Sequence, residues 1–233
     1  MIKFFRTFKM SAIETGKLKQ YMTYAFGEVL LIVVGILLAL QINNWNEARK
    51  NKLENRKMLE QIKEENLINQ FALQRDKEYR DTIVSVYNGF INLLAMPNLP
   101  SHKDEIEQYI RTLFRSTSYS FATSSLVSYL NNNKNDNSLI AKSLLELNSN
   151  MSDLEIISKK GFDLKFENFY EGLSEDVDLS SLTVSGFGSL QKFSFRNKMV
   201  LNSYVEEEIS NKFDITRKQQ ILVDSLITDY LKH

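Results

Sequence analysis

The chain has 233 residues, of which only 2 are proline, 8 are glycine and none is cysteine. These counts exclude disulfide-stapled secreted scaffolds, collagen-like or low-complexity chains and turn-rich β-sandwiches, and they favour long helices. The 29 lysines and arginines balance 29 aspartates and glutamates. A polyanion therefore has no electrostatic reason to bind the whole chain, and we expect no nucleic acid partner.

Residues 1–24 are predicted to form a basic amphipathic arm on the cytoplasmic side of a membrane. Phe4, Phe5 and Phe8 would share one face of a helix, with lysine and arginine side chains around them. This pattern is typical of a short helix that lies on an anionic lipid surface. A disordered basic tail is the alternative.

Residues 25–42 are the most apolar part of the chain. Glu28 is the only ionisable residue among them, and residues 29–40 are wholly apolar. At about 1.5 Å per residue the stretch reaches about 27 Å, close to the ~30 Å hydrocarbon core of a bilayer. We therefore predict a transmembrane helix in the lipid bilayer, with a cleaved signal peptide or a buried soluble helix as alternatives. Interfacial aromatic residues are expected at Tyr21, Tyr24 and Trp45.

The orientation is predicted from the lengths of the two flanks. Lysine and arginine residues are about equally frequent on both sides of the span, so the positive-inside rule alone does not decide. The short arm stays inside more easily, whereas a long C-terminal domain crosses largely regardless of its charge. We predict a cytoplasmic N-terminus with residues 43–233 on the other side. The absence of cysteine is compatible with an oxidising compartment there.

Glu28, Gly35 and Ala39 lie on one stripe of the predicted transmembrane helix. Gly35 and Ala39 form a small-x-x-x-small pattern, which is typical of close packing between membrane helices. We interpret the stripe as an interface for a partner helix, with a plain lipid-facing surface as the alternative. A proton-coupled role for Glu28 is a third interpretation, which its place near the headgroups disfavours.

Several short runs near the N-terminus carry a resemblance. They are Met1-Ile2-Lys3-Phe4-Phe5-Arg6, Tyr24-Ala25-Phe26-Gly27-Glu28, Val33-Val34-Gly35-Ile36 and Ala39-Leu40-Gln41-Ile42-Asn43-Asn44-Trp45-Asn46-Glu47. Together they resemble the opening of a family of uncharacterised bacterial single-pass membrane proteins, a domain of unknown function. The resemblance implies a bacterial inner-membrane anchor with a periplasmic C-terminal domain. It implies no activity, cofactor or catalytic residue.

Residues 43–57 are predicted to continue the helix as a solvated stalk, because they contain neither glycine nor proline and few apolar residues. Residues 58–233 are predicted to form an antiparallel helical bundle, so the fold class is all-α. The first bundle helix has an apolar stripe at Met58, Leu59, Ile62, Ile68, Phe71, Ala72, Tyr79, Ile83, Val86, Tyr87, Phe90 and Leu94.

Beyond this helix, Ser101 and Asp104 are spaced as a capping box and predict the start of a second helix. A stretch rich in serine and threonine follows at residues 116–125. Further helices are predicted at residues 106–114, 126–130, 140–157 with an extension to 169, and 197–231, with a long loop at 174–195 that has room for a short hairpin.

No candidate for catalysis passes a chemical test. Glu64-Glu65 and Glu206-Glu207-Glu208 are expected on solvated helix faces, so they predict no paired acid and base. Arg111 and Arg115, beside the Ser/Thr-rich stretch, could contact an anion, with structural capping as the alternative. We therefore predict no catalytic, cofactor-binding or metal-binding residue.

The anatomy predicts a function in protein interaction. The leading hypothesis is a membrane-anchored periplasmic interaction or scaffolding module without catalytic activity, whose partner is another membrane or periplasmic protein or a second copy. A helical domain that senses a small ligand and signals through a partner membrane protein is the alternative, since ligands often bind between helices. An enzyme is the third hypothesis, and the scarcity of acid and base groups disfavours it.

Overall fold

The computed structural model describes residues 18–232, and its side chains from residue 22 onward. The chain divides into two compact units, residues 1–55 and 56–233, which are described separately below. The first 17 positions of the predicted basic arm, and the side chain of Tyr21, lie outside the described residues.

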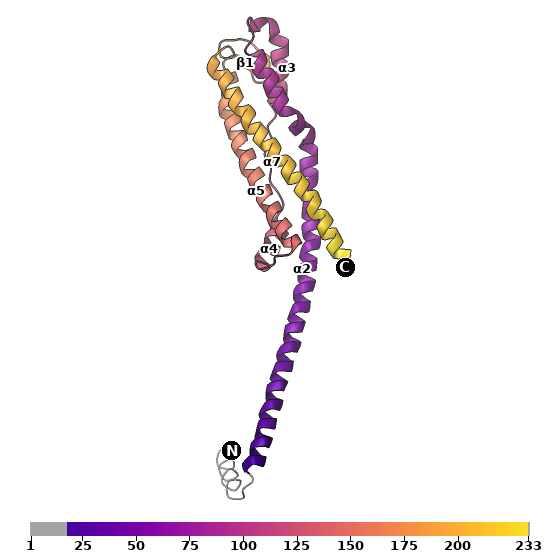
Figure 1. The fold of residues 1–233 in the computed structure, drawn as a ribbon. Coiled ribbons are helices and arrows are strands. Elements are labelled where there is room, and N and C mark those ends of the chain that lie inside the picture. The colour runs from indigo at the N-terminus through magenta and orange to yellow at the C-terminus, as the bar shows by residue number, and fades with distance from the viewer. Residues whose placement is uncertain (1–17, 233) are drawn as a thin grey trace. The chain divides into compact units, whose positions relative to one another are not determined.

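Helix dominates the described residues, which confirms the all-α prediction (Figure 1). The long helices are α2 (Leu18–Leu93), α5 (Leu139–Lys165) and α7 (Phe193–Lys232). The shorter elements are a 3-10 turn (Leu99–His102), α3 (Lys103–Leu113), α4 (Ser124–Asn132), a π-helical turn (Phe166–Tyr170), α6 (Glu171–Leu173), and the antiparallel pair β1 (Val177–Asp178) and β2 (Thr183–Val184).

The first unit is the N-terminal part of α2. The large apolar side chains of residues 29–42 are between 44 % and 74 % exposed, so this part of the helix buries none of them. The helix continues without a break through residues 43–57. Nothing in that sequence stops it, because it contains no glycine and no proline.

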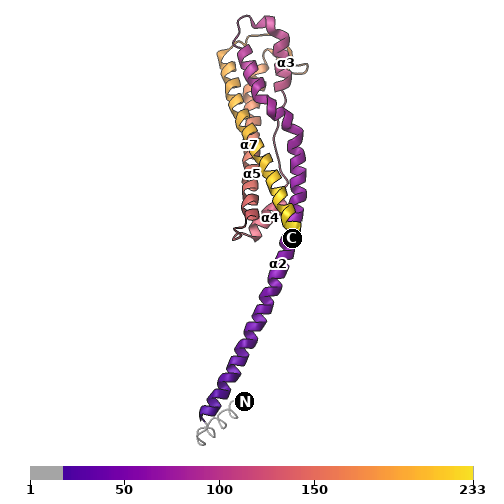
Figure 2. The same cartoon turned by 45° about the vertical axis from the view of Figure 1, so that its right-hand side comes forward.

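The second unit is a bundle of α5, α7 and the part of α2 after residue 55. Helix α7 runs antiparallel to the other two, as Figures 1 and 2 show. Helices α2 and α5 run in the same direction, because an extended segment, residues 115–123, carries the chain back between them. We call this segment the strap. It occupies the place that a fourth helix takes in an up-down-up-down bundle.

Besides flanking buried residues such as Tyr79 and Leu93, each long helix carries a row of buried residues in alternating steps of three and four, the heptad spacing of coiled coils. Each is less than 9 % exposed. In α2 they are Leu59, Ile62, Asn66, Asn69, Leu73, Asp76, Arg80, Ile83, Tyr87 and Phe90; in α5, Leu144, Leu147, Met151, Leu154, Ser158, Gly161 and Lys165; in α7, Phe195, Met199, Asn202, Glu206, Ile209, Phe213, Thr216, Gln220, Val223 and Ile227.

Two large apolar clusters fill the ends of the bundle, and the middle combines polar side chains with a smaller apolar cluster that includes Leu73, Leu154 and Phe213. One cluster surrounds Phe90 and Phe169, and the other surrounds Leu59 and Met151. Most of the other heptad positions between the two large clusters hold charged, amide or hydroxyl side chains. The prediction that the apolar stripe packs in the core was wrong at two residues, since Ile68 is 63 % and Phe71 is 70 % exposed. The heptad register places both on the outer face of α2.

The predicted capping box at Ser101 is also wrong. The preceding 3-10 turn moves the start of α3 to Lys103, so His102 is its N-cap residue and makes no side-chain cap hydrogen bond. The Ser101 hydroxyl instead donates to the carbonyl of Asn98 at 2.8 Å. The short helix α4, the extension of α5 past Gly161 and the small hairpin agree with the prediction.

Candidate functional site

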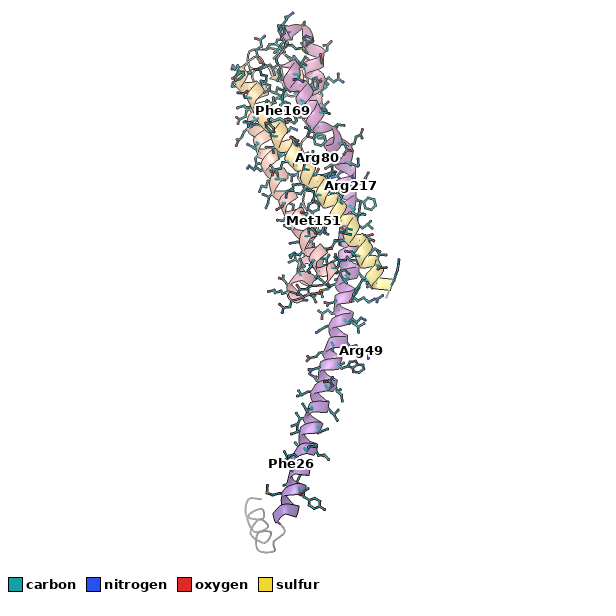
Figure 3. The ribbon with its side chains drawn as sticks, viewed as in Figure 1. Phe26, Arg49, Arg80, Met151, Phe169 and Arg217 are labelled. Atoms are coloured by element: carbon teal, nitrogen blue, oxygen red, sulfur yellow. The ribbon has the colours of Figure 1, made fainter. Side chains whose placement is uncertain are left out.

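The polar middle of the bundle is built around a buried carboxylate, Glu206 of α7. Its Oε2 atom lies 2.6 Å from Nη1 of Arg80 in α2, and its Oε1 atom lies 3.8 Å from Nζ of Lys165 in α5. The three side chains are 7 %, 2 % and 2 % exposed. Figure 3 shows Arg80 between Phe169 and Met151 along the bundle, so the ionic cluster lies between the two large apolar clusters.

A second ion pair lies beside this cluster. Asp76 accepts a hydrogen bond from Nη2 of Arg115 at 2.5 Å. The ring of Tyr79 contacts both guanidinium groups, with its centroid 4.7 Å from Cζ of Arg80 and 4.7 Å from Cζ of Arg115. Both distances are within the range of cation–π attraction. Removing one charged member of such a buried network leaves the charge of its partner buried and unpaired, which is destabilising.

Burial shifts the protonation equilibria of the cluster. Desolvation lowers the pKa of Lys165 to about 8, although Glu206 partly opposes the shift. Desolvation, together with the charge of Glu206, raises the pKa of Tyr79 far above its ordinary value. Tyr79 therefore stays a neutral hydrogen-bond donor at physiological pH. The pKa of Lys165 lies within about one unit of physiological pH.

The cluster holds the backbone of the strap at its first residue. The carbonyl oxygen of Arg115 accepts hydrogen bonds from the Tyr79 hydroxyl at 2.8 Å and from Nζ of Lys165 at 2.5 Å. Arg80 donates to the hydroxyl of Thr117, two residues further on. Charged groups at core positions of α2 and α5 thus bind the strap as well as each other.

Neutral and acidic side chains hold the rest of the strap. The amide of Asn69 pairs with both backbone groups of Ala122, at 2.9 Å and 3.0 Å. From α5, Ser158 accepts from the Tyr119 amide at 3.2 Å and Glu155 accepts from the Phe121 amide at 2.7 Å. An extended segment in a helical bundle has no neighbouring strand, so these side chains supply the hydrogen bonds that its buried backbone needs.

Helix α4, which follows the strap, is capped by a side chain of α2. Glu65 accepts hydrogen bonds from the Ser124 hydroxyl at 2.7 Å and from the Ser125 amide at 2.9 Å. Although burial raises the pKa of Glu65, these bonds together with one from the Leu126 amide bring it below its ordinary value. A carboxylate at a helix N-terminus is also favoured by the helix dipole.

The predicted role of the glutamate runs was therefore wrong in part. Glu206 was expected on a solvated face, but it is the central carboxylate of the bundle, whereas Glu207 and Glu208 are exposed. Sequence reasoning also missed Arg80, Lys165 and Asn69. The uninterrupted heptad spacing of apolar residues on both sides of them is the signal that could have revealed their burial.

Arg111 and Arg115, the predicted anion contacts, each lie near an acid of the protein. Arg115 binds Asp76, and Arg111 lies 4.0 Å from Glu107 one helical turn away. The N-terminal amides of α4 bind Glu65. An external anion would therefore compete with carboxylates already in place, and a role of these arginines in anion binding stays a prediction.

The predicted membrane-interface and helix-packing residues lie on the exposed surface of the first unit. Tyr24 is 77 % and Trp45 is 68 % exposed. Glu28 and Ala39 are also exposed, and a side-chain carbon added at Gly35 would meet nothing within 4 Å. This surface is free within the described residues, and its packing against a partner helix stays a prediction.

The ionic cluster is closed to substrates, since its side chains are buried and engaged with one another and the strap. Among the residues that the structure describes, no three histidine, aspartate or glutamate side chains come together as metal ligands. An open groove of about 570 Å³ lies where Ser118, Tyr119 and Ser120 of the strap run beside Ile156 and Phe162 of α5.

One described helix is long and apolar enough to cross a membrane. Helix α2 holds an 18-residue window of mean hydropathy 2.4, none of which is buried. A signal sequence has the same character, so by length and composition this stretch of the all-α chain fits either a membrane span or a signal sequence.

The comparisons with known proteins add no chemistry. Residues 28–134 match a family of unknown function (DUF6090). The matched region begins in the apolar part of α2 and includes α3, the strap and α4. No curated protein and no solved structure matches the chain.

Proposed function

We propose that this protein is a membrane-anchored, non-enzymatic interaction module. Its N-terminus lies in the cytoplasm, residues 25–42 cross the bacterial inner membrane, and the helical bundle binds another protein in the periplasm. The observation that carries the proposal is the apolar window of α2, of which no part is buried. A core helix of a soluble protein would bury such a surface, because its exposure to water is costly.

Two further features support an uncleaved anchor with a non-catalytic domain. The residues after the span, Gln41 to Asn46, contain no small-x-small cleavage site. In the bundle, the side chains best suited to acid and base chemistry are those of the ionic cluster, and they hold the strap. A structural use of these groups leaves interaction at the surface as the function that the geometry supports best.

Fractionation tests the anchor. We expect the full-length chain to pellet with membranes after ultracentrifugation, to resist a high-salt wash and to enter solution with detergent. Because the chain has no cysteine, a single Leu53→Cys substitution reports topology, and we expect a membrane-impermeant maleimide to label it from the periplasmic side. A full-length chain that stays in the aqueous fraction contradicts the proposal.

Detergent extraction tests the interaction. We expect the tagged full-length chain to be recovered with another protein or as an oligomer at near-native expression. Recovery of the chain alone and monomeric, after mild detergents and chemical cross-linking in the membrane, counts against an interaction module.

Ligand sensing is a second candidate, favoured by the groove between the strap and α5. Its volume of about 570 Å³ lies within the ~300–1,000 Å³ of small-molecule sites. The groove combines apolar Ile156 and Phe162 with the cation of Lys159. A thermal-shift screen of the detergent-solubilised chain against metabolites tests this idea, since binding raises the melting temperature. A flat response across the panel speaks against it.

A further inference from the structure

An apolar groove lies between α2 and α7, on the outside of the bundle. It is lined by Leu67 and Phe71 of α2 and by Ile221 of α7, which are 55 %, 70 % and 56 % exposed. Phe71 was expected in the core, and the structure instead places its ring at the surface. Exposed apolar side chains that gather in one groove are typical of a binding surface.

The same groove contains a cation without a partner. Arg217 of α7, labelled in Figure 3, is half-buried. Within residues 22–232 no hydrogen bond or ion pair engages its guanidinium group. Its polar neighbours in the groove are the uncharged side chains of Gln70 and Gln74. A partly desolvated guanidinium beside apolar side chains favours a carboxylate, which it binds with strong, directional hydrogen bonds.

The dimensions of the groove favour a side chain of a protein over a small molecule. Its volume is about 210 Å³, below the ~300–1,000 Å³ of most ligand sites. Leu67 and Phe71 are one helical turn apart, the spacing at which a groove between helices accepts apolar residues of a docked helix.

The charges on the outer face of α2 disfavour a second copy of this chain. Exposed glutamates flank the apolar residues on that face. A two-fold axis through the groove would bring Glu64 near the same residue of the other copy if the α2 helices ran parallel. In either orientation the groove would face the same groove of the other copy, whose lining offers Arg217 no carboxylate. Like charges placed opposite each other oppose association, so a different protein fits better.

We propose that the α2·α7 groove docks a helical segment of a partner protein, with apolar side chains on Leu67, Phe71 and Ile221 and a carboxylate on Arg217. This inference rests on the proposed interaction function and gives it a surface and a partner chemistry. The apolar residues supply the contact area, and the ion pair at the edge of the groove sets which helix is accepted.

Site-specific photo-cross-linking in cells tests the groove. The full-length chain carries benzoylphenylalanine in place of Phe71, and matched chains carry it at Ile156 of α5 and Tyr204 of α7, each 67 % exposed. We expect an adduct with another protein at position 71. Its yield should fall about tenfold with Arg217→Glu, corresponding to about 1.4 kcal/mol, and should largely persist with Arg217→Lys.

The partner chemistry is then read from the adduct. Mass spectrometry of the cross-linked peptide should find an aspartate or glutamate within about one helical turn of the attachment point. Replacing that residue by lysine in the partner should restore the adduct to the chain with Arg217→Glu. Circular dichroism of each purified variant separates a lost contact from a lost fold.

Other outcomes overturn the inference in distinguishable ways. An adduct of twice the 27.1 kDa chain mass shows a second copy in the groove. An adduct at position 71 that is insensitive to Arg217→Glu shows that no carboxylate pairs there. Adducts only at position 156 or 204 show that the interface lies elsewhere on the bundle, which contradicts the groove but not the proposed interaction function. No adduct at any position, with a monomeric chain in detergent, overturns both proposals.

Discussion

Helix α2 carries apolar side chains on its outside over residues 29–40 and polar side chains on its inside over residues 66–80. In the first region every large apolar residue is exposed, and in the second Asn66, Asn69, Asp76 and Arg80 are buried. The same helix therefore reverses the usual rule of burial twice, and the two regions reverse it for different physical reasons.

The comparison shows that burial follows the surroundings of a side chain as well as its hydrophobicity. The proposed surroundings of the first region are lipid chains, in which exposed apolar residues are stable. The surroundings of the second are α7 and the strap, whose polar groups need hydrogen-bond partners that apolar residues lack. Polar residues at core positions are tolerated there because nearly every one of them has a partner to bind.

The largest expected effect comes from substitutions in the exposed apolar region of α2. Val34→Arg combined with Leu37→Arg places two charges in the middle of the apolar window, at a cost of about 5–7 kcal/mol for insertion. We expect the chain to move from the membrane pellet to the soluble or aggregated fraction after ultracentrifugation. Leu53→Arg, outside the window, is the matched control and should leave the chain in the pellet.

The next effect removes the central carboxylate of the bundle. Glu206→Ala leaves Arg80 and Lys165 buried without a counter-charge, and we expect a loss of about 3–5 kcal/mol in the free energy of unfolding. Urea denaturation followed by circular dichroism measures it. Glu207→Ala, on the exposed side of the same helix turn, should change stability by less than about 0.5 kcal/mol. Equal effects of the two substitutions contradict a buried cluster.

Asn69→Ala tests the hydrogen bonds between α2 and the strap. The change leaves both backbone groups of Ala122 without their partner, and we expect a loss of about 2–3 kcal/mol. Hydrogen exchange should be faster at the Ala122 amide than in the parent chain, and unchanged in the first turns of α7. Gln70→Ala, one residue further along the helix, is the control for a general loss of helix stability.

The pH dependence of stability tests the environment of Lys165. The folded state holds the lysine pKa at about 8, whereas the unfolded pKa is about 10.4. Between these values the unfolded chain binds more protons, so Lys165 by itself should raise stability by about 2 kcal/mol from pH 8 to pH 10. From about pH 9 upward the buried tyrosines oppose this rise, because their pKa values are raised on folding from about 10 in the unfolded chain.

Denaturation curves at intervals of half a pH unit measure this dependence. A Lys165→Met chain, which keeps the volume and loses the charge, should lack the rise between pH 8 and pH 10. A rise of the same size in that variant assigns it to another group and contradicts the buried lysine.

The smallest effect concerns the cap that Glu65 provides for α4. Glu65→Ala should cost about 1 kcal/mol, because the first amides of the helix lose their acceptor. The folded pKa of this carboxyl is lowered. Its contribution is therefore present above the unfolded pKa of about 4.3 and is lost as the pH falls through the folded value. Glu64→Ala is the control, and a melt at pH 7 and at pH 3 separates the two.

Much of the fold follows from the sequence, since glycine and proline are rare and apolar residues recur at helical steps. The long helices, the short helix α4 and the small hairpin were predictable from spacing and turn residues. The predicted apolar stripe in α2 was wrong at Ile68 and Phe71, because the stripe was assigned from apolar residue types and not from the heptad positions. From Leu59 and Ile62 the heptad leads to Asn66 and Asn69, and those amides are the buried residues.

The ionic cluster was beyond the reach of sequence reasoning for a different reason. Arg80, Lys165 and Glu206 come from helices far apart in the chain, and each taken alone resembles an exposed charged residue. Their burial depends on the strap, an extended segment whose route between α2 and α5 no helical periodicity encodes. The heptad positions mark them as inward-facing, but only the packed bundle shows which groups they meet.

The strap is held mainly through its main-chain atoms, with inward contacts from Thr117, Tyr119 and Phe121 and outward exposure of Ser118, Ser120 and Ala122. Hydrogen bonds from α2 and α5 to the backbone of the strap do not depend on the side chains that point away from these helices. The outward positions are consequently free to diversify during evolution while the chain keeps its path. A labelled or reactive amino acid introduced at Ser118 or Ser120 should be accommodated with little strain, which offers a convenient handle for following the domain in living cells.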